Sequence, residues 1–115
     1  MTSPAFLLDE HLPHALIRAL QQREPAMQVY AVGRPEGPPR TAKDPQLLLW
    51  IEDHQCLMVT NDRASLATHL RDHLAAGHHM PGILVVPRFF SFRTLIDELY
   101  QFGLVVVHNW SILAV

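Results

Sequence analysis

The sequence predicts an α/β fold, a three-layer α/β/α sandwich in which helices cover both faces of a mostly parallel sheet. Short apolar runs that end in polar or turn residues alternate with stretches whose apolar residues recur at helical spacing. The length of 115 residues and the hydrophobic share of 49% fit one globular domain over 1–115. Such alternation is typical of the doubly wound strand order 2-1-3-4-5, which places the first strand beside the third.

The first third of the chain contains two predicted strands and one helix. Phe6–Leu8 is a short apolar run that ends at Asp9, as expected for a buried strand. Apolar residues then follow at i, i+3, i+4, i+7 and i+8 from Leu12, with Pro13 suited to a first helical turn. Met27–Val32 predicts a second strand, and the glycines and prolines of 33–43 predict an exposed loop.

The middle of the chain predicts a helix, a strand and a second helix. Asp44-Pro45 is typical of an N-cap followed by proline at the first helical position, with the helix continuing over Leu47–Asp53. Cys56–Thr60 predicts the third strand, and Asn61-Asp62 ends it and can cap the next helix. The expected apolar face of that helix and its stop signal are Leu66, Leu70, Leu74 and Gly77.

The last third predicts a fourth strand and leaves the end of the chain open. Ile83–Val86 is the strand. Leu95, Leu99, Phe102 and Val106 keep helical spacing across Gly103. Either one helix runs past Gly103, or 104–107 is a strand, and 112–115 predicts a last strand.

Composition favours a cytoplasmic protein without a membrane span. A single cysteine, Cys56, excludes an internal disulfide and favours a reducing compartment, where a thiol on a strand is expected to be buried and inert. No apolar run approaches the ~18 residues of a membrane span, and the N-terminus lacks a basic signal region. The formal net charge of -2 disfavours a nucleic-acid partner when it is taken as a bulk property.

Acidic residues follow the predicted strands where parallel sheets bind ligands. Asp9 comes directly after the first strand, with Glu10 next to it, and Asp62 comes two residues after the third strand. Asp44 opens the helix after the second strand. Because these positions share the carboxyl edge of the sheet, three carboxylates would converge there. A hard cation such as Mg²⁺ or Mn²⁺ would relieve their repulsion and could activate water at a phosphodiester.

Each acidic residue also has a simpler interpretation. Asp44 and Asp62 can serve only as helix caps, and Asp9-Glu10 can be a solvated strand end. The three together are more informative than any one alone, because all lie at one end of the predicted sheet.

Several segments resemble a known family. Phe6–Pro13 (Phe-Leu-Leu-Asp-Glu-His-Leu-Pro) resembles the opening LLDENLP-type segment of small PIN-like proteins. Val59–Arg63 (Val-Thr-Asn-Asp-Arg) resembles their VTxDK/R segment, and Ala75–Ile83 is similar to the turn and strand that follow. The similarity is clear over 6–86 and weak beyond. It implies a PIN-like fold in the PIN-domain superfamily, whose better-known members are metal-dependent ribonucleases, including VapC-type toxins paired with antitoxins.

The resemblance also implies residue roles. Asp9, Asp44 and Asp62 match the catalytic carboxylates that hold Mg²⁺ or Mn²⁺. Relatives often carry a further Asp two residues after the third carboxylate, where this chain has Ala64. Ser65 would supply a nearby hydroxyl oxygen there.

Three further residues are expected to support this site. Glu10 lies beside Asp9, His11 occupies the family's usual Asn position, and Arg63 can face a phosphate. For Arg63 the simpler interpretation is an exposed helix residue.

Three functions compete at this point. The first is a PIN-type ribonuclease acting on RNA, as the toxin of a toxin–antitoxin pair with an antitoxin protein as partner. The alternative is a weakly active or inactive PIN-like binding module, because Ala64 replaces a carboxylate. A receiver-type phosphoacceptor ranks low, since Lys43 is the only lysine and does not follow the last strand.

Two other features stand outside the acidic site. Three Phe between two Arg in 88–93 predict an interface, either for RNA or for another protein chain. The overall acidity favours a protein chain, and thus a homo-oligomer. His69 and His73 have the i, i+4 spacing of zinc ligands, although histidines on a surface helix are the simpler interpretation.

Overall fold

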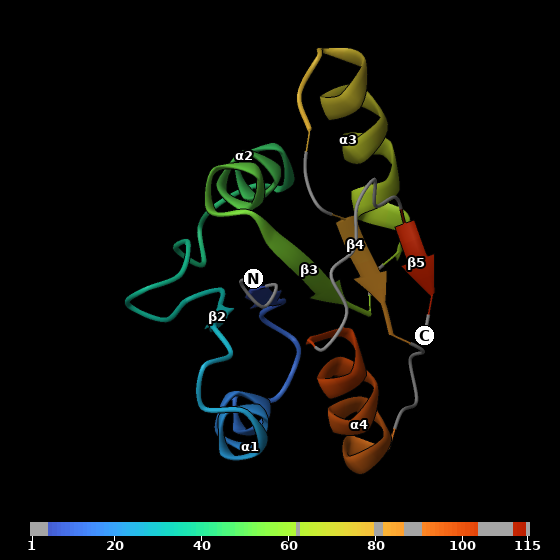
Figure 1. Cartoon of the computed structure of the whole chain (residues 1–115). Coiled ribbons are helices and arrows are strands. Elements are labelled where there is room, and N and C mark those ends of the chain that lie inside the picture. Colours follow the sequence, from blue (N-terminus) through green and yellow to red (C-terminus); the bar gives the residue numbers. More distant parts are fainter. Residues whose placement is uncertain (1–4, 62, 80–81, 87–90, 104–111, 115) are drawn as a thin grey trace.

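A computed structural model describes residues 5–61, 63–79, 82–86, 91–103 and 112–114. Its strands and helices alternate along the chain as β1 (Ala5–Leu8), α1 (Ala15–Arg23), β2 (Val29–Ala31), α2 (Asp44–His54), β3 (Cys56–Thr60), α3 (Arg63–Ala75), β4 (Gly82–Val85), α4 (Phe92–Gly103) and β5 (Ile112–Ala114). The described strands form one sheet in the order β2-β1-β3-β4-β5, and all four neighbouring pairs are parallel (Figure 1). The predicted α/β class and strand order are confirmed.

Alternate residues of the strands face two separate cores, which makes the structure three-layered. Phe6, Leu8 and Val59 pack with α1 and α4 on one face of the sheet. Leu7 and Met58 belong to the core formed with α2 and α3 on the other face. Residues on both faces are therefore apolar, as expected for a parallel sheet covered on each side.

The two helices on the first face are also joined at their surface. Arg23 at the end of α1 donates a hydrogen bond to Asp97 of α4. Its guanidinium carbon lies 4.3 Å from the centre of the Tyr100 ring, a cation–π contact. This contact fixes α1 against α4 at the end of the helix away from His14.

The loop between β2 and α2 folds back against β2. Gly33 N–H donates to the carbonyl of Pro38 at 2.9 Å, and Gly37 N–H donates to that of Arg34 at 3.0 Å. A Cβ added at Gly37 would lie 2.2 Å from the carbonyl oxygen of Ala31, so only glycine allows this close approach. The loop thereby holds Arg34 and Arg40 near the carboxyl edge of the sheet.

Two predicted helix starts are wrong by one to three residues. The helix expected from Leu12 begins at Ala15, so Pro13 precedes it, because Leu12 N–H donates to the Asp9 carbonyl in a turn. Leu12 is buried all the same. The N-cap of α2 is Lys43 rather than Asp44, and its backbone N–H donates to Gln46 Oε1 at 2.9 Å.

The other differences concern the ends of α3 and α4. Leu74 was expected on the apolar face of α3 but is 47% exposed. Gly77 ends this helix as predicted, with φ at +91°. Within the described residues α4 ends at Gly103, and 104–111, where the continued helix or a strand was expected, lie outside them. No helix of the described part has the length and hydrophobicity that a membrane span requires.

Candidate functional site

A small cavity lies at the carboxyl edge of the sheet, where the chain leaves β1. Its volume is about 100 Å³. Asp9, directly after β1, and Asp44, the first residue of α2, both line it, as do Glu10 and His11. Two of the three predicted carboxylates are therefore brought together, at the point where strand order reverses between β1 and β3.

Asp9 is held by its neighbours in the sheet. Its backbone N–H donates to the Val59 carbonyl at 2.9 Å, which continues the β1–β3 pairing. The hydroxyl of Thr60, a buried residue, donates to Asp9 Oδ2 at 2.7 Å, and Glu10 N–H donates to Oδ1 at 2.7 Å. These hydrogen bonds use one lone pair on each carboxylate oxygen, so both oxygens retain a second for a ligand.

Asp44 faces the cavity from the first turn of α2. The positive end of the helix dipole favours a carboxylate there. Nε2 of His69, on α3, lies 3.8 Å from Asp44 Oδ2. An imidazolium at His69 would thus pair with Asp44 when no cation does.

The rim of the cavity carries both signs of charge. Nε of Arg40 lies 3.9 Å from Glu10 Oε2, and its side chain is 71% exposed. Nε2 of His11 lies 3.7 Å from Glu10 Oε1. Arg40 therefore presents most of its N–H donors to solvent, beside the two aspartates.

The remaining predicted residues are positioned less completely. Asp62 lies outside the described residues. Arg63 and Ser65 belong to the first turn of α3, but their side chains are not among those described. Leu66 of the same turn lines the cavity, so this turn lies next to it.

Sequence reasoning missed Thr60, Arg40 and His69 at this site. The sequence contained a signal for Thr60, because it is the one polar residue in the predicted strand Cys56–Thr60. The structure shows that this residue is fully buried. Arg40 and His69 come from a loop and from the second turn of a helix. Only the folded chain brings them to Asp9 and Asp44.

The described donor set fits a hard divalent cation. Mg²⁺ is commonly held by one or two carboxylates, with waters and substrate phosphates completing the octahedron. Asp9 and Asp44 supply two carboxylates, and the cavity leaves space for a hydrated ion.

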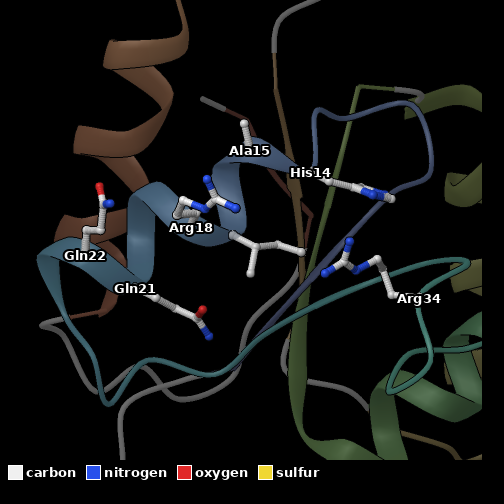
Figure 2. A pocket seen from close by; sticks show the side chains of 7 residues that line it. His14, Ala15, Arg18, Gln21, Gln22 and Arg34 are labelled. Atoms are coloured by element: carbon white, nitrogen blue, oxygen red, sulfur yellow. The ribbon is translucent and has the colours of Figure 1, made fainter.

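A polar groove runs along α1 from the same edge of the sheet. It combines a hollow of about 560 Å³ with an adjoining one of about 340 Å³, and both are lined by Ile17, Gln21 and Arg34. Figure 2 shows Arg34 reaching toward α1, with His14 and Arg18 on the facing side (Figure 2). The charged lining residues of the groove are Arg18, Arg34 and the acidic Glu36. His14 and Arg34 follow His11 and Val32 of the cavity by three and two residues, so the groove begins near the cavity.

A second group of titratable residues lies at the opposite, amino edge. Glu52 of α2 meets His73 of α3 and His78 of the following turn. Partial burial raises the pKa of Glu52, but hydrogen bonds from His79 N–H and His78, together with the His78 charge and a hydrogen bond from His73, outweigh it and lower the pKa. His73 is buried, so the expectation that it is a surface histidine is wrong. Its side chain pairs with Glu52 rather than with His69.

Cys56, at the start of β3, is buried as predicted. Burial raises the pKa of its thiol from the ordinary 9.0 to about 12. The thiol is therefore protonated at neutral pH and is not a nucleophile.

Comparison with known proteins finds no match to a family model, a curated protein or a solved structure.

Proposed function

We propose that this protein is a PIN-type ribonuclease that hydrolyses RNA phosphodiesters with Mg²⁺ or Mn²⁺. The observation that carries the proposal is the cavity in which Asp9 and Asp44 converge at the switch point of the parallel sheet. The resemblance of Phe6–Pro13 and Val59–Arg63 to PIN-like segments supports the same chemistry, with Asp62 as third carboxylate.

In this proposal the protein residues orient the Asp9 carboxylate and the phosphate, and the cation would activate the water. Thr60 fixes the rotation of the Asp9 carboxylate, so that its free lone pairs face the cavity. Arg40 at the rim exchanges its ion pair with Glu10 for hydrogen bonds that it donates to a phosphate oxygen. A Mg²⁺ or Mn²⁺ ion held by Asp9 and Asp44 would supply an activated water and would stabilise charge on the phosphate.

The groove along α1 supports RNA as the substrate. Arg18, Arg34 and His14 offer donors for successive phosphates, although the whole chain is slightly acidic. A single strand lying in the groove would reach the cavity at the His14 end. Local positive charge, rather than net charge, is what such binding requires.

The test is cleavage of single-stranded RNA with Mn²⁺ by the wild type and by three Asp→Asn variants. Removing a cation ligand costs several kcal/mol of transition-state stabilisation, so Asp9→Asn, Asp44→Asn and Asp62→Asn should each lose about 100-fold or more in rate. Asp53→Asn is the matched control, because Asp53 is 84% exposed at the far end of α2. Equal rates in the wild type and Asp44→Asn would refute the proposal.

The second candidate is a PIN-like binding module without catalysis, and Ala64 favours it. The loss of one carboxylate weakens cation binding. Calorimetry with Mn²⁺ separates the two functions without any substrate. Binding that Asp44→Asn abolishes supports the nuclease, whereas no binding at millimolar Mn²⁺ supports the module.

A toxin role and a homo-oligomer belong to the same proposal. The toxin role follows from the resemblance to PIN-like proteins, and induced expression should arrest growth in the wild type but not in Asp44→Asn. The oligomer follows from the Phe-rich segment 88–93, of which Phe92 is 39% exposed at the start of α4. Light scattering should then show a dimer that Phe92→Ser weakens.

A further inference from the structure

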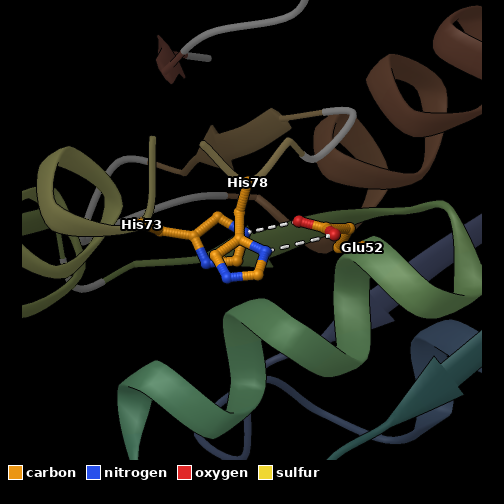
Figure 3. A group of neighbouring side chains, drawn as sticks. All are labelled: Glu52, His73 and His78. Atoms are coloured by element: carbon orange, nitrogen blue, oxygen red, sulfur yellow. Dashed lines mark hydrogen bonds and ion pairs between the residues drawn. The ribbon is translucent and has the colours of Figure 1, made fainter. Parts of the chain in front are cut away.

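Glu52, His73 and His78 form a compact group of two imidazoles and one carboxylate at the amino edge of the sheet. One ligand atom from each lies within 4.8 Å of the others. Figure 3 shows both imidazole rings turned toward the same carboxylate (Figure 3). We propose that these three residues hold a borderline divalent metal ion, Zn²⁺, at a site separate from the acidic cavity.

The distances within the group are close to those that zinc imposes. With bonds of 2.0–2.1 Å, tetrahedral ligand atoms are about 3.4 Å apart. Glu52 Oε1 lies 2.9 Å from His73 Nε2, and Glu52 Oε2 lies 3.4 Å from His78 Nδ1. These two distances run to different oxygens of the carboxylate, and one ligand atom from each residue lies within 4.8 Å of the others. Side-chain rotations that bring one oxygen and both nitrogens to about 3.4 Å from one another would receive the ion, and a water would complete the tetrahedron.

The fold holds each ligand before a metal arrives. The His73 side chain is 5% exposed, and its ring stacks on that of His78 with centroids 4.8 Å apart and 20° between planes. The turn at Gly77 brings His78 back beside α3, and His78 N–H donates to the His73 carbonyl at 3.2 Å. His79 N–H fixes Glu52 Oε1 at 2.8 Å. Such preorganisation reduces the entropic cost of binding.

The ligand types select a different ion from the acidic cavity. Imidazole nitrogens suit Zn²⁺ and its neighbours, whereas Mg²⁺ prefers oxygen ligands alone. The two sites also lie at opposite edges, since Asp9 and Asp44 follow strands while Glu52 stands near the end of α2, just before β3. A zinc ion here would join α2, α3 and the turn before β4 and so stabilise their packing, while the water in the fourth position leaves the ion accessible.

The experiment is calorimetric titration of the metal-free full chain with Zn²⁺, with thermal unfolding as a second readout. We expect one Zn²⁺ per chain and a higher Tm, because a ligand that binds only the folded state stabilises it. Mg²⁺ should not displace Zn²⁺ from this group, because Mg²⁺ prefers oxygen ligands alone. Glu52→Gln and His78→Ala should each weaken Zn²⁺ binding at least tenfold.

Two control variants make the result specific. His14→Ala removes a histidine on the other face of the sheet, and Asp44→Asn alters the acidic cavity, so both should bind Zn²⁺ as the wild type does. Wild-type affinity in a folded His78→Ala protein, or an equal loss in His14→Ala, would overturn the assignment. His78 is 44% exposed in a turn, so its replacement tests the site even where Glu52→Gln fails to fold.

Discussion

Replacing Thr60 by valine exchanges a buried hydroxyl for a methyl group and keeps the rest of the side chain. That hydroxyl donates to Asp9 Oδ2 at 2.7 Å. A hydrogen bond to a charged group contributes about 1.5–3 kcal/mol, but Asp9 is partly exposed, so water can replace part of it and about 1–2 kcal/mol is expected. Thr60 has further interactions, and a single variant would combine all of them.

A double-mutant cycle isolates the Thr60–Asp9 term. Urea unfolding of the wild type, Thr60→Val, Asp9→Ala and the double variant should give a coupling free energy of about 1–2 kcal/mol. Thr60→Ser keeps the hydroxyl and loses a methyl worth about 0.8 kcal/mol, so its coupling to Asp9 should remain. Mn²⁺ affinity should fall about 10-fold to 100-fold in Thr60→Val alone. A coupling below about 0.3 kcal/mol would show that Thr60 does not hold Asp9 and would refute the positioning argument.

Three further perturbations test the groove, the loop and the thiol. Arg34→Ala should weaken single-stranded RNA binding and make the negative slope of log K against log salt shallower by about 0.7. Arg71→Ala, on the other face of the sheet, should change neither the affinity nor the slope. Equal effects of the two variants would show that the groove does not bind RNA. Gly37→Ala should lower the free energy of unfolding by about 1–3 kcal/mol in urea titrations, because its Cβ would meet the Ala31 carbonyl, and an unchanged midpoint would contradict that close approach. The pKa of Cys56 is about 12 in the folded chain and has the ordinary value of 9.0 in the unfolded chain, so the thiol is protonated in both states below pH 9. Between pH 9 and 12 only the unfolded chain loses the thiol proton, so the free energy of unfolding should fall as pH rises through this range. Denaturation of Cys56→Ala should lack this contribution.

Strand–helix alternation was sufficient to predict the sheet. The runs Phe6–Leu8 and Cys56–Val59 are apolar on both faces, as expected for strands of a doubly covered parallel sheet. The resulting order places β1 beside β3, and this is the reason that the cavity was expected after β1. Local patterns therefore predicted that Asp9 and Asp44 lie together at this edge of the sheet, where both line the cavity.

Element ends depend on contacts that local patterns do not contain. Leu12 continues the apolar stripe of α1, yet it sits in a turn that buries it on the same side. The prediction that Leu74 lies on the apolar face of α3 is wrong for a different reason. The 13 residues of α3 extend about 20 Å, whereas the four residues of β4, the strand that follows, span about 13 Å, so the helix is longer than this strand by about one turn. Figure 1 shows this helix projecting beyond its neighbouring strands.

The same projection explains why the histidine group could not be predicted. His73 lies in the last turns of α3, where Glu52 and His78 rather than the sheet cover it. The sequence separations of 21 and 26 residues from Glu52 to these partners carry no periodic signal. The visible i, i+4 pair instead suggested His69, which lies one turn nearer the start of α3 and whose imidazole lies beside Asp44.

The opposite placement of the two groups gives the proposals independent consequences. Asp44 is the first residue of α2 and Glu52 stands two residues before its end, so one helix connects the two edges of the sheet. In the proposals a hard cation bound at Asp44 would act on the phosphate reaction, whereas zinc at Glu52 would act on the stability of the fold. Asp44→Asn should then abolish Mn²⁺-dependent cleavage and leave the Zn²⁺-induced rise in Tm unchanged, and His78→Ala should do the reverse. If either variant altered both responses, the chain would hold one metal site rather than two.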